Sequence, residues 1–162
     1  MTDLAPDSTA MLAHMQRLFS ELPEELRDGR VELASTDPKD GKLKCGRLFR
    51  VTELKKAAET AARLNAVAGK SVYVGAALRR RDAARDRRAS DKDFFALTAL
   101  YADFDNPGEL ERAEALCREK GTPPTMKVIT GRHPHLRGQL WWKLREPILD
   151  PVVSRRFNRA IA

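Results

Sequence analysis

The chain has 162 residues, 42% of them hydrophobic and 33% charged, so it is long enough to bury one sizeable core but short for two domains. Thirty lysines and arginines against 23 aspartates and glutamates give a net charge of +7, which favours a partner that carries phosphates. The sequence has no apolar run near the ~20 residues of a membrane helix, no secretory signal pattern and only Cys45 and Cys117, and it therefore excludes a membrane protein and a disulfide-built secreted one and predicts a cytoplasmic location.

The first third of the chain predicts a helix, a β-hairpin and a second helix. Residues 8–22 place their apolar side chains at helical spacing. Two short strands follow in 30–35 and 45–51, and the turn-forming residues between them predict a hairpin. Residues 52–69 then carry a stripe of leucine and alanine that ends in glycine, which predicts a helix.

The middle of the chain contains two strand patterns separated by an arginine-rich segment. "SVYVGAAL" at 71–78 is rich in β-branched and small residues, which predicts a single strand. Residues 79–93 have no apolar period and predict a mobile connection. "FFALTALYADFD" at 94–105 is apolar on both faces for most of its length, as expected of a central strand.

The last third predicts two helices and two further strands. "NPGELERAEALCREKG" at 106–121 has proline and acids at its start, basic residues near its end and a closing glycine, which together predict a helix beginning at Pro107. Residues 126–130 and 138–148 read as strands, and Asp150 is placed to cap a terminal helix.

This order of elements predicts the α+β class, with a mostly antiparallel sheet and helices packed on it. We expect residues 1–45 to form an N-terminal helix and hairpin extension and residues 46–162 to form the core of the domain.

Asp103 and Asp105 end the predicted central strand and project from the same face, because residues i and i+2 of a strand share a face. Two adjacent carboxylates repel each other unless a cation lies between them. Mg²⁺ is bound by one or two carboxylates together with substrate phosphates and water, so the pair is a candidate metal site. The alternative is structural: Asp105 caps the following helix and Asp103 is only solvated.

A second polar cluster lies in the turn between the last two predicted strands. Thr130 and Gly131 end one strand, and a basic turn leads back into a strand that carries Trp141 and Trp142 on opposite faces. Arginine, histidine and amide side chains are suitable donors to a triphosphate. The candidate donors in the turn are Arg132, His133, His135 and Arg137, and Gln139 begins the return strand.

Taken together, the two clusters resemble the primase-polymerase superfamily of archaeal and eukaryotic type, and within it the RepB-like primases of plasmids and phages. The resemblance rests on "SVYVGAALRRR", "ALYADFD", "PPTMKVITGRHPH" and "GQLWWKLREPI", which lie within residues 71–148. It implies an RRM-like catalytic core in which Asp103 and Asp105 are metal ligands and catalytic residues. It also implies that Thr130, Arg132, His135, Arg137 and Gln139 bind the nucleotide. His135, His133 and Gln139 all stay open as the residue that contacts the phosphate.

The activity implied is that of a DNA primase or polymerase, a nucleotidyltransferase of a plasmid or phage replication protein that uses Mg²⁺ or Mn²⁺ in two-metal catalysis. The implied partners are a single-stranded DNA template, nucleoside triphosphates and a replicative helicase. The residues implied to lie near the template or the triphosphate are Arg79, Arg80 and Arg81.

The family's third acid, on a later strand, has no counterpart after Trp142. The resemblance then implies either a C-terminally truncated domain that is inactive on its own or a degenerate relative. Two other functions stay open. One is a non-catalytic module of the same fold that binds single-stranded nucleic acid. The other is a nicking enzyme that would use His133 and His135 with a nucleophilic tyrosine, for which the sequence offers Tyr73 and Tyr101.

Overall fold

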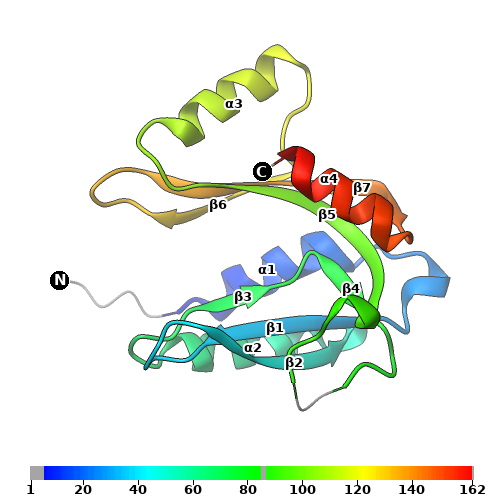
Figure 1. The fold of residues 1–162 in the computed structure, drawn as a ribbon. Helices are drawn as coiled ribbons and strands as arrows, with labels where there is room; N and C mark the ends of the chain where they lie inside the picture. The colour runs from blue at the N-terminus through cyan, green and yellow to red at the C-terminus, as the bar shows by residue number, and fades with distance from the viewer. Residues whose placement is uncertain (1–5, 85–86, 162) are drawn as a thin grey trace. The chain divides into compact units, whose positions relative to one another are not determined.

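The structure is a computed structural model that describes residues 6–84 and 87–161 (Figure 1). The chain forms two compact units, Met1–Leu97 and Thr98–Ala162. The described strands are ordered β2-β1-β4-β5-β7-β6, with β3 paired to β1, and each pairing whose register is defined is antiparallel. The predicted α+β class with an antiparallel sheet is confirmed. No helix in the described ranges is both long enough and apolar enough to span a membrane.

The first unit contains two helices and the first strands of the sheet. Its elements are α1 (Ser8–Phe19), β1 (Arg30–Thr36), β2 (Leu43–Arg50), α2 (Leu54–Asn65), β3 (Val72–Val74) and β4 (Ala77–Arg79), with short 3-10 helices at Glu24–Leu26, Val51–Glu53 and Asp91–Asp93. The predicted hairpin is confirmed as the antiparallel pair β1–β2. The expected boundary between residues 45 and 46 falls inside β2, and the proposed division of the chain at that point stays a prediction.

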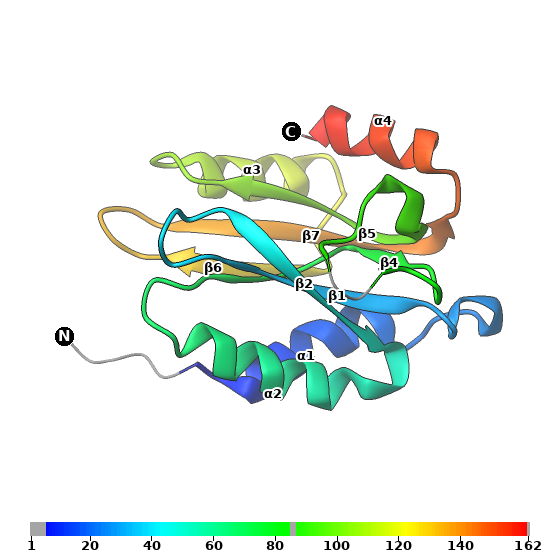
Figure 2. The same ribbon diagram turned by 60° about the horizontal axis from the view of Figure 1, so that its bottom comes forward.

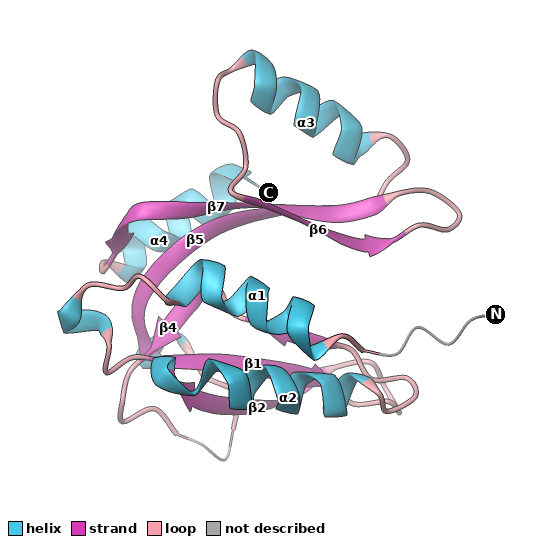
Figure 3. Cartoon of the chain, turned by 180° about the vertical axis from the view of Figure 1, so that it is seen from behind, coloured by secondary structure: helices cyan, strands magenta, loops and turns pink. Residues whose placement is uncertain are grey.

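Both helices of this unit lie side by side on one face of β1 and β2 (Figure 3). Their apolar stripes form the core: Met15, Leu18 and Phe19 of α1 are at most 3% exposed. Ala57 and Ala61 of α2 are equally buried, and their small side chains allow the two helices to pack closely. The helical spacing seen in the sequence therefore identifies the buried faces correctly.

The predicted strand at 71–78 is divided in two. Gly75 interrupts it, and its N–H donates to the Glu32 carbonyl. β3 pairs with β1, whereas β4 pairs mainly with β5. The chain thus passes from the neighbour of one strand to the neighbour of another within two residues. Such a step is easiest at glycine, which has no side chain to accommodate.

The described part of the arginine-rich segment is anchored, which corrects the expectation of a mobile connection. The Glu32 carboxylate, buried on β1, accepts hydrogen bonds from Arg79 Nε at 2.9 Å and from the Ala89 N–H at 2.8 Å. Arg87 donates to Asp93, which also accepts from the Ser90 N–H and hydroxyl. The Arg87 bond is the main reason that the pKa of Asp93 lies far below its ordinary value.

His14 of α1 gives the first unit a predictable response to pH. Burial lowers the pKa of His14 from 6.5 to about 4. The unfolded chain takes up a proton on this side chain near pH 6.5, whereas the folded chain does so only near pH 4. The resulting stabilisation is complete above the unfolded pKa and is lost as the pH falls toward the folded one. We expect the free energy of unfolding to drop by at most about 3 kcal/mol across this window.

The measurement is urea denaturation at several pH values for the wild type and for His14→Gln, whose side chain does not titrate. The variant should lose less stability than the wild type between about pH 6.5 and 4.5. His133→Gln, a change at an exposed histidine of the other unit, is the control and should follow the wild type. Equal pH slopes in the wild type and His14→Gln would contradict the prediction.

The second unit contains the end of the central strand, two further strands and two helices. Its elements are β5 (Phe94–Phe104, which begins in the first unit), α3 (Glu109–Glu119), β6 (Met126–Gly131), β7 (Arg137–Ile148) and α4 (Pro151–Ile161). Helix α3 lies over one face of β7 (Figures 1 and 2). Under it Leu110 and Leu140 are fully buried. Asp150 caps α4 as predicted, because its carboxylate accepts the Val152 N–H at 2.7 Å.

Helix α3 begins two residues later than predicted. Its N-cap is Gly108, whose φ of 73° lies in the left-handed region that favours glycine, and no side chain caps the helix. The turn before it is closed instead by Glu109, whose carboxylate accepts from the backbone and side-chain N–H groups of Asn106 at 3.1 and 2.8 Å. The interpretation of Asp105 as the helix cap is therefore wrong.

Candidate functional site

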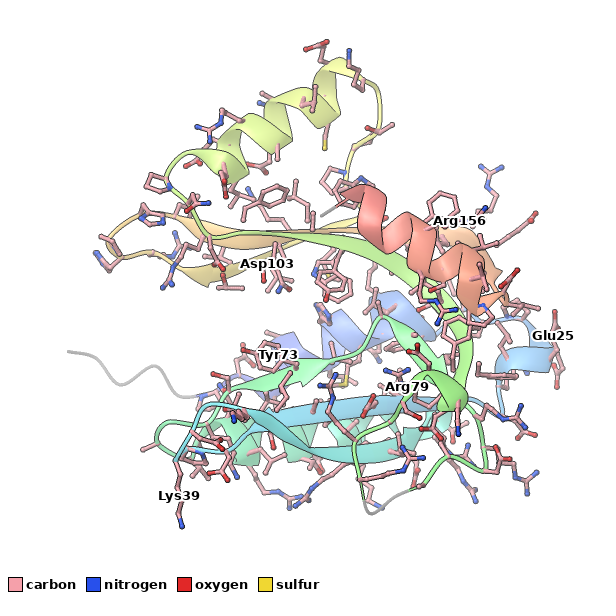
Figure 4. The ribbon with its side chains drawn as sticks, viewed as in Figure 1. Glu25, Lys39, Tyr73, Arg79, Asp103 and Arg156 are labelled. Carbon is pink, nitrogen blue, oxygen red and sulfur yellow. The ribbon has the colours of Figure 1, made fainter. Side chains whose placement is uncertain are left out.

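The two predicted acidic residues lie at the C-terminal end of β5, within the second unit. Asp103 is the penultimate residue of the strand, Asp105 follows the strand directly, and both are exposed. The labelled Asp103 lies on the side of β5 that faces away from α3 (Figure 4). Alternation along a strand places Tyr101 on the same face as Asp103. The helix covers the other face, so these side chains are not part of the core beneath α3.

Gln139 of β7 connects Asp103 to the neighbouring strand. Its side-chain Nε2 donates to Oδ2 of Asp103 at 3.1 Å. The indole Nε1 of Trp141 donates in turn to Oε1 of Gln139 at 3.2 Å. Both polar atoms of the Gln139 amide are therefore engaged, and the amide lies between the carboxylate and the indole.

Trp141 and Tyr101 form an aromatic pair on this same face. Their ring centroids lie 4.7 Å apart with an interplanar angle of 20°, which is a stacked arrangement. Trp141 is 3% exposed, whereas Tyr101 is 44% exposed. Trp142 points to the opposite side of β7, where its Nε1 donates to the Thr122 carbonyl at 3.1 Å. The predicted opposite orientation of the two tryptophans is confirmed.

The turn between β6 and β7 meets the end of β5. Ile129 pairs with Gly138 and Gly131 with Arg137, so that Thr130 is an extra residue on β6 and forms a β-bulge. At the far side of the turn, Nε2 of His135 lies 2.6 Å from the carbonyl oxygen of Asp105. Because the acceptor is a carbonyl, this ring nitrogen carries the proton. The turn also contains a cis peptide bond between His133 and Pro134.

Arg137 packs against a glycine across the strand pair. A Cβ on Gly131 would lie 2.5 Å from Nη2 and 2.7 Å from Nε of Arg137, so the guanidinium occupies the space that a side chain at residue 131 would need. The Arg137 Nε is buried and has no hydrogen-bond partner within the described ranges. Arg132, by contrast, is exposed.

The arginines of the turn differ from Arg79, Arg80 and Arg81 in whether an acidic side chain pairs with them. Arg79 pairs with Glu32, Arg80 with Asp82 and Arg81 with Asp28. Across residues 6–84 and 87–161, by contrast, no carboxylate forms an ion pair with Arg132 or Arg137. The turn therefore carries positive charge available to an external anion. Contact of Arg79, Arg80 and Arg81 with nucleic acid stays a prediction.

The acidic residues can be tested for their fit to a divalent cation. Asp103 and Asp105 supply hard oxygen donors of the type that Mg²⁺ and Mn²⁺ prefer, and both side chains reach solvent. Within the described ranges no group of three or more His, Cys, Asp or Glu side chains is close enough to hold a metal ion. Two carboxylates alone would leave most coordination positions of such an ion to other oxygen ligands, such as those of water or phosphate.

The predicted nucleotide-binding residues lie in the turn between β6 and β7 or on the strand ends beside it: Thr130, Arg132, His135, Arg137 and Gln139. The structure brings His135 and Gln139 into contact with the strand end that carries the acids. The alternation that groups the two aspartates also places Tyr101, one of the two candidate nucleophiles, beside Asp103. The signal for an exposed aromatic next to the acids was therefore present.

Comparison of the chain with protein-family models, with curated proteins and with solved structures found no match in any of the three.

Proposed function

We propose that this chain is a nucleotidyltransferase domain of the primase-polymerase type, with an RRM-like core, that joins nucleotides on a single-stranded DNA template as part of a plasmid or phage replication protein. The observation that carries the proposal is the junction of the basic turn with the acidic end of β5. His135 reaches the Asp105 carbonyl and Gln139 reaches the Asp103 carboxylate. Two segments about 30 residues apart in sequence thus bring together, at one edge of the second unit, acidic residues and arginines that have no acidic partner in the described ranges.

Acidic and basic side chains at one site are the groups needed to bind a triphosphate together with its metal ion. Asp103 and Asp105 would hold Mg²⁺ or Mn²⁺, and the bound ions would favour ionisation of the attacking hydroxyl and stabilise charge on the leaving pyrophosphate. An ion held by only two carboxylates needs further oxygens, and phosphate groups are the ligands that Mg²⁺ most often adds in such sites.

The turn would bind the phosphate groups themselves. Arg132 and Arg137 have no acidic partner in the part of the chain that the structure describes, so binding a phosphate breaks no existing ion pair. Their planar guanidinium groups present paired N–H donors that match phosphate oxygens. Thr130, on the bulge beside them, adds an exposed hydroxyl donor.

A second candidate function is a non-catalytic module that binds single-stranded nucleic acid. The observation that favours it is Tyr101, which is supported on one side by Trp141 and is 44% exposed. An aromatic ring held in this way is a surface on which a base can stack, at about 1–3 kcal/mol per base. The unbalanced arginines of the turn would then contact the nucleic-acid backbone.

The experiment that separates the two functions measures binding of labelled ATP, dATP and a single-stranded oligonucleotide to the purified chain, with Mg²⁺, with Mn²⁺ and with a chelator. It is accompanied by an assay for template-dependent extension. The proposed enzyme binds triphosphate in the presence of the metal ion and no longer binds triphosphate when the ion is removed. The alternative outcome is oligonucleotide binding that weakens with salt and is unchanged by the chelator, without any binding of triphosphate. That outcome would establish the non-catalytic binding module and reject the enzyme.

A further inference from the structure

We propose that Gln139 is a positioning residue for Asp103, and that Trp141 sets the orientation of the Gln139 amide that makes this possible. This inference rests on the proposed function and deepens it. It assigns to Gln139 the task of holding a carboxylate, where sequence reasoning expected a contact with phosphate. The three side chains form a directional chain of hydrogen bonds, from Trp141 Nε1 to Gln139 Oε1 and from Gln139 Nε2 to Asp103 Oδ2.

The direction of this chain follows from the chemistry of its two ends. An indole nitrogen only donates, and an ionised carboxylate only accepts. A glutamine amide between them satisfies both only when its oxygen faces the indole and its NH₂ group faces the carboxylate. With the amide turned over, two donors would face each other at one end and two acceptors at the other. The flanking groups therefore select one of the two amide orientations.

The indole is itself held in place, which makes it a suitable reference point. Trp141 is 3% exposed and stacks on Tyr101, so its N–H has little freedom to move away from Gln139. Gln139 is partly buried, whereas Asp103 is exposed. The series of hydrogen bonds thus leads from a fixed aromatic ring outward to a carboxylate that would otherwise rotate freely in solvent. Holding that side chain in one rotamer is what a two-ligand metal site requires.

Only one oxygen of Asp103 is occupied by this contact. Gln139 Nε2 bonds to Oδ2, and each carboxylate oxygen has two lone-pair directions. The carboxylate therefore keeps acceptor capacity for a cation while its orientation is restrained. Ligating carboxylates in metal sites are commonly hydrogen-bonded in this way, and loss of such a partner costs about 10- to 100-fold in affinity or activity.

The test uses the full chain and two matched substitutions. Trp141→Phe removes the N–H that faces Gln139 and keeps a ring to stack on Tyr101. Trp142→Phe removes an equivalent N–H on the next residue, which faces the Thr122 carbonyl on the other side of β7. Gln139→Glu is the complementary variant. Its carboxylate can still accept a hydrogen bond from the Trp141 indole, but it lies beside the Asp103 carboxylate and repels it.

The first readout needs no activity. The chain has two glutamines and three asparagines, so a ¹⁵N spectrum shows few side-chain amide pairs, and the pair lost in Gln139→Glu identifies Gln139. This pair should shift in Trp141→Phe and in Asp103→Ala and stay unchanged in Trp142→Phe. A Gln139 amide that is insensitive to both Trp141→Phe and Asp103→Ala would overturn the inference, whether or not the chain is an enzyme.

The second readout distinguishes positioning from phosphate binding. In the extension assay at a saturating concentration of Mg²⁺, Trp141→Phe should lower kcat by about 10- to 100-fold while the KM for the nucleotide stays within about twofold, because the misplaced group is a metal ligand and not a contact with the phosphates. Trp142→Phe should retain the wild-type kcat. A rise in KM with unchanged kcat in Trp141→Phe would instead show that Gln139 contributes to phosphate binding, and it would overturn the positioning role. Absence of extension by the wild type would reject the proposed function and leave the spectroscopic result to decide this inference.

Discussion

Replacement of Asp103 and Asp105 together by asparagine should abolish metal-dependent binding of triphosphate and reduce nucleotide joining by at least about a thousandfold. Each carboxylate is exposed at or just after the end of β5, and that of Asp103 keeps acceptor capacity beside its bond to Gln139. Asparagine keeps the shape of aspartate but lacks the charge that holds Mg²⁺ beside phosphate. Metal ions stabilise the transition state of phosphoryl transfer by several kcal/mol, and each 1.36 kcal/mol is a factor of ten in rate.

The control is the pair Glu111→Gln with Glu146→Gln, which removes the same two negative charges from exposed positions of the same unit. This variant should bind and join nucleotides like the wild type, so that a loss in the aspartate variant is not an effect of net charge. Salt-dependent binding of single-stranded DNA should persist in both variants. Nucleotide joining within about twofold of wild type after loss of both aspartates would end the assignment of these residues as metal ligands.

Replacement of Glu32 by glutamine should destabilise the first unit by about 3–5 kcal/mol. The Glu32 side chain is 3% exposed and that of Arg79 16% exposed. Removing the charge leaves a guanidinium in a mostly buried position without its counter-ion, which is far costlier than loss of a surface pair. A loss of this size is a large share of the stability of a typical domain. The measurement is urea denaturation followed by circular dichroism.

Asp28→Asn is the matched control, because Asp28 also pairs with an arginine, Arg81, but at 3.7 Å and with both side chains about three-quarters exposed. That change should alter the free energy of unfolding by less than about 1 kcal/mol. Limited digestion with trypsin adds a local readout: Glu32→Gln should speed cleavage after Arg87 and Arg88, because the Ala89 N–H loses its charged acceptor. A stability loss below about 1 kcal/mol in Glu32→Gln would show that this ion pair does not anchor the arginine-rich segment.

The sequence predicted the local elements well because their causes are local. The apolar spacing in residues 8–22 corresponds to the buried face of α1, and the alternation in β5 correctly groups Tyr101 with Asp103. The one strand that was misjudged, at 71–78, divides at Gly75, where β-branched neighbours suggested continuity. The start of α3 was shifted by two residues because Gly108, and not an acidic side chain, forms the N-cap.

What could not be predicted depends on partners far apart in the sequence. Glu32 lies 47 residues from Arg79 and 57 from Ala89, so no local pattern reveals that the arginine-rich segment is tied to β1. Gln139 lies 36 residues from Asp103, and its amide could be assigned to a phosphate as readily as to a carboxylate. Alternation places Trp141 and Trp142 on opposite faces, yet it does not show which of them meets Tyr101.

The register of β7 against β6, including the bulge at Thr130, decides which side chains of β7 share the face of Asp103. A register slip of one residue moves every following side chain to the other face of a strand. Insertion or deletion of a single residue at Gly138, inside β7, would thus turn Arg137 away from the face that Gln139 and Trp141 share, unless a second irregularity compensated for it. In the hairpin tip at 37–42, the carboxylates of Asp37 and Asp40 accept short-range hydrogen bonds from the Lys39 and Lys42 N–H groups. Related chains should therefore vary in length at that tip more than inside β7.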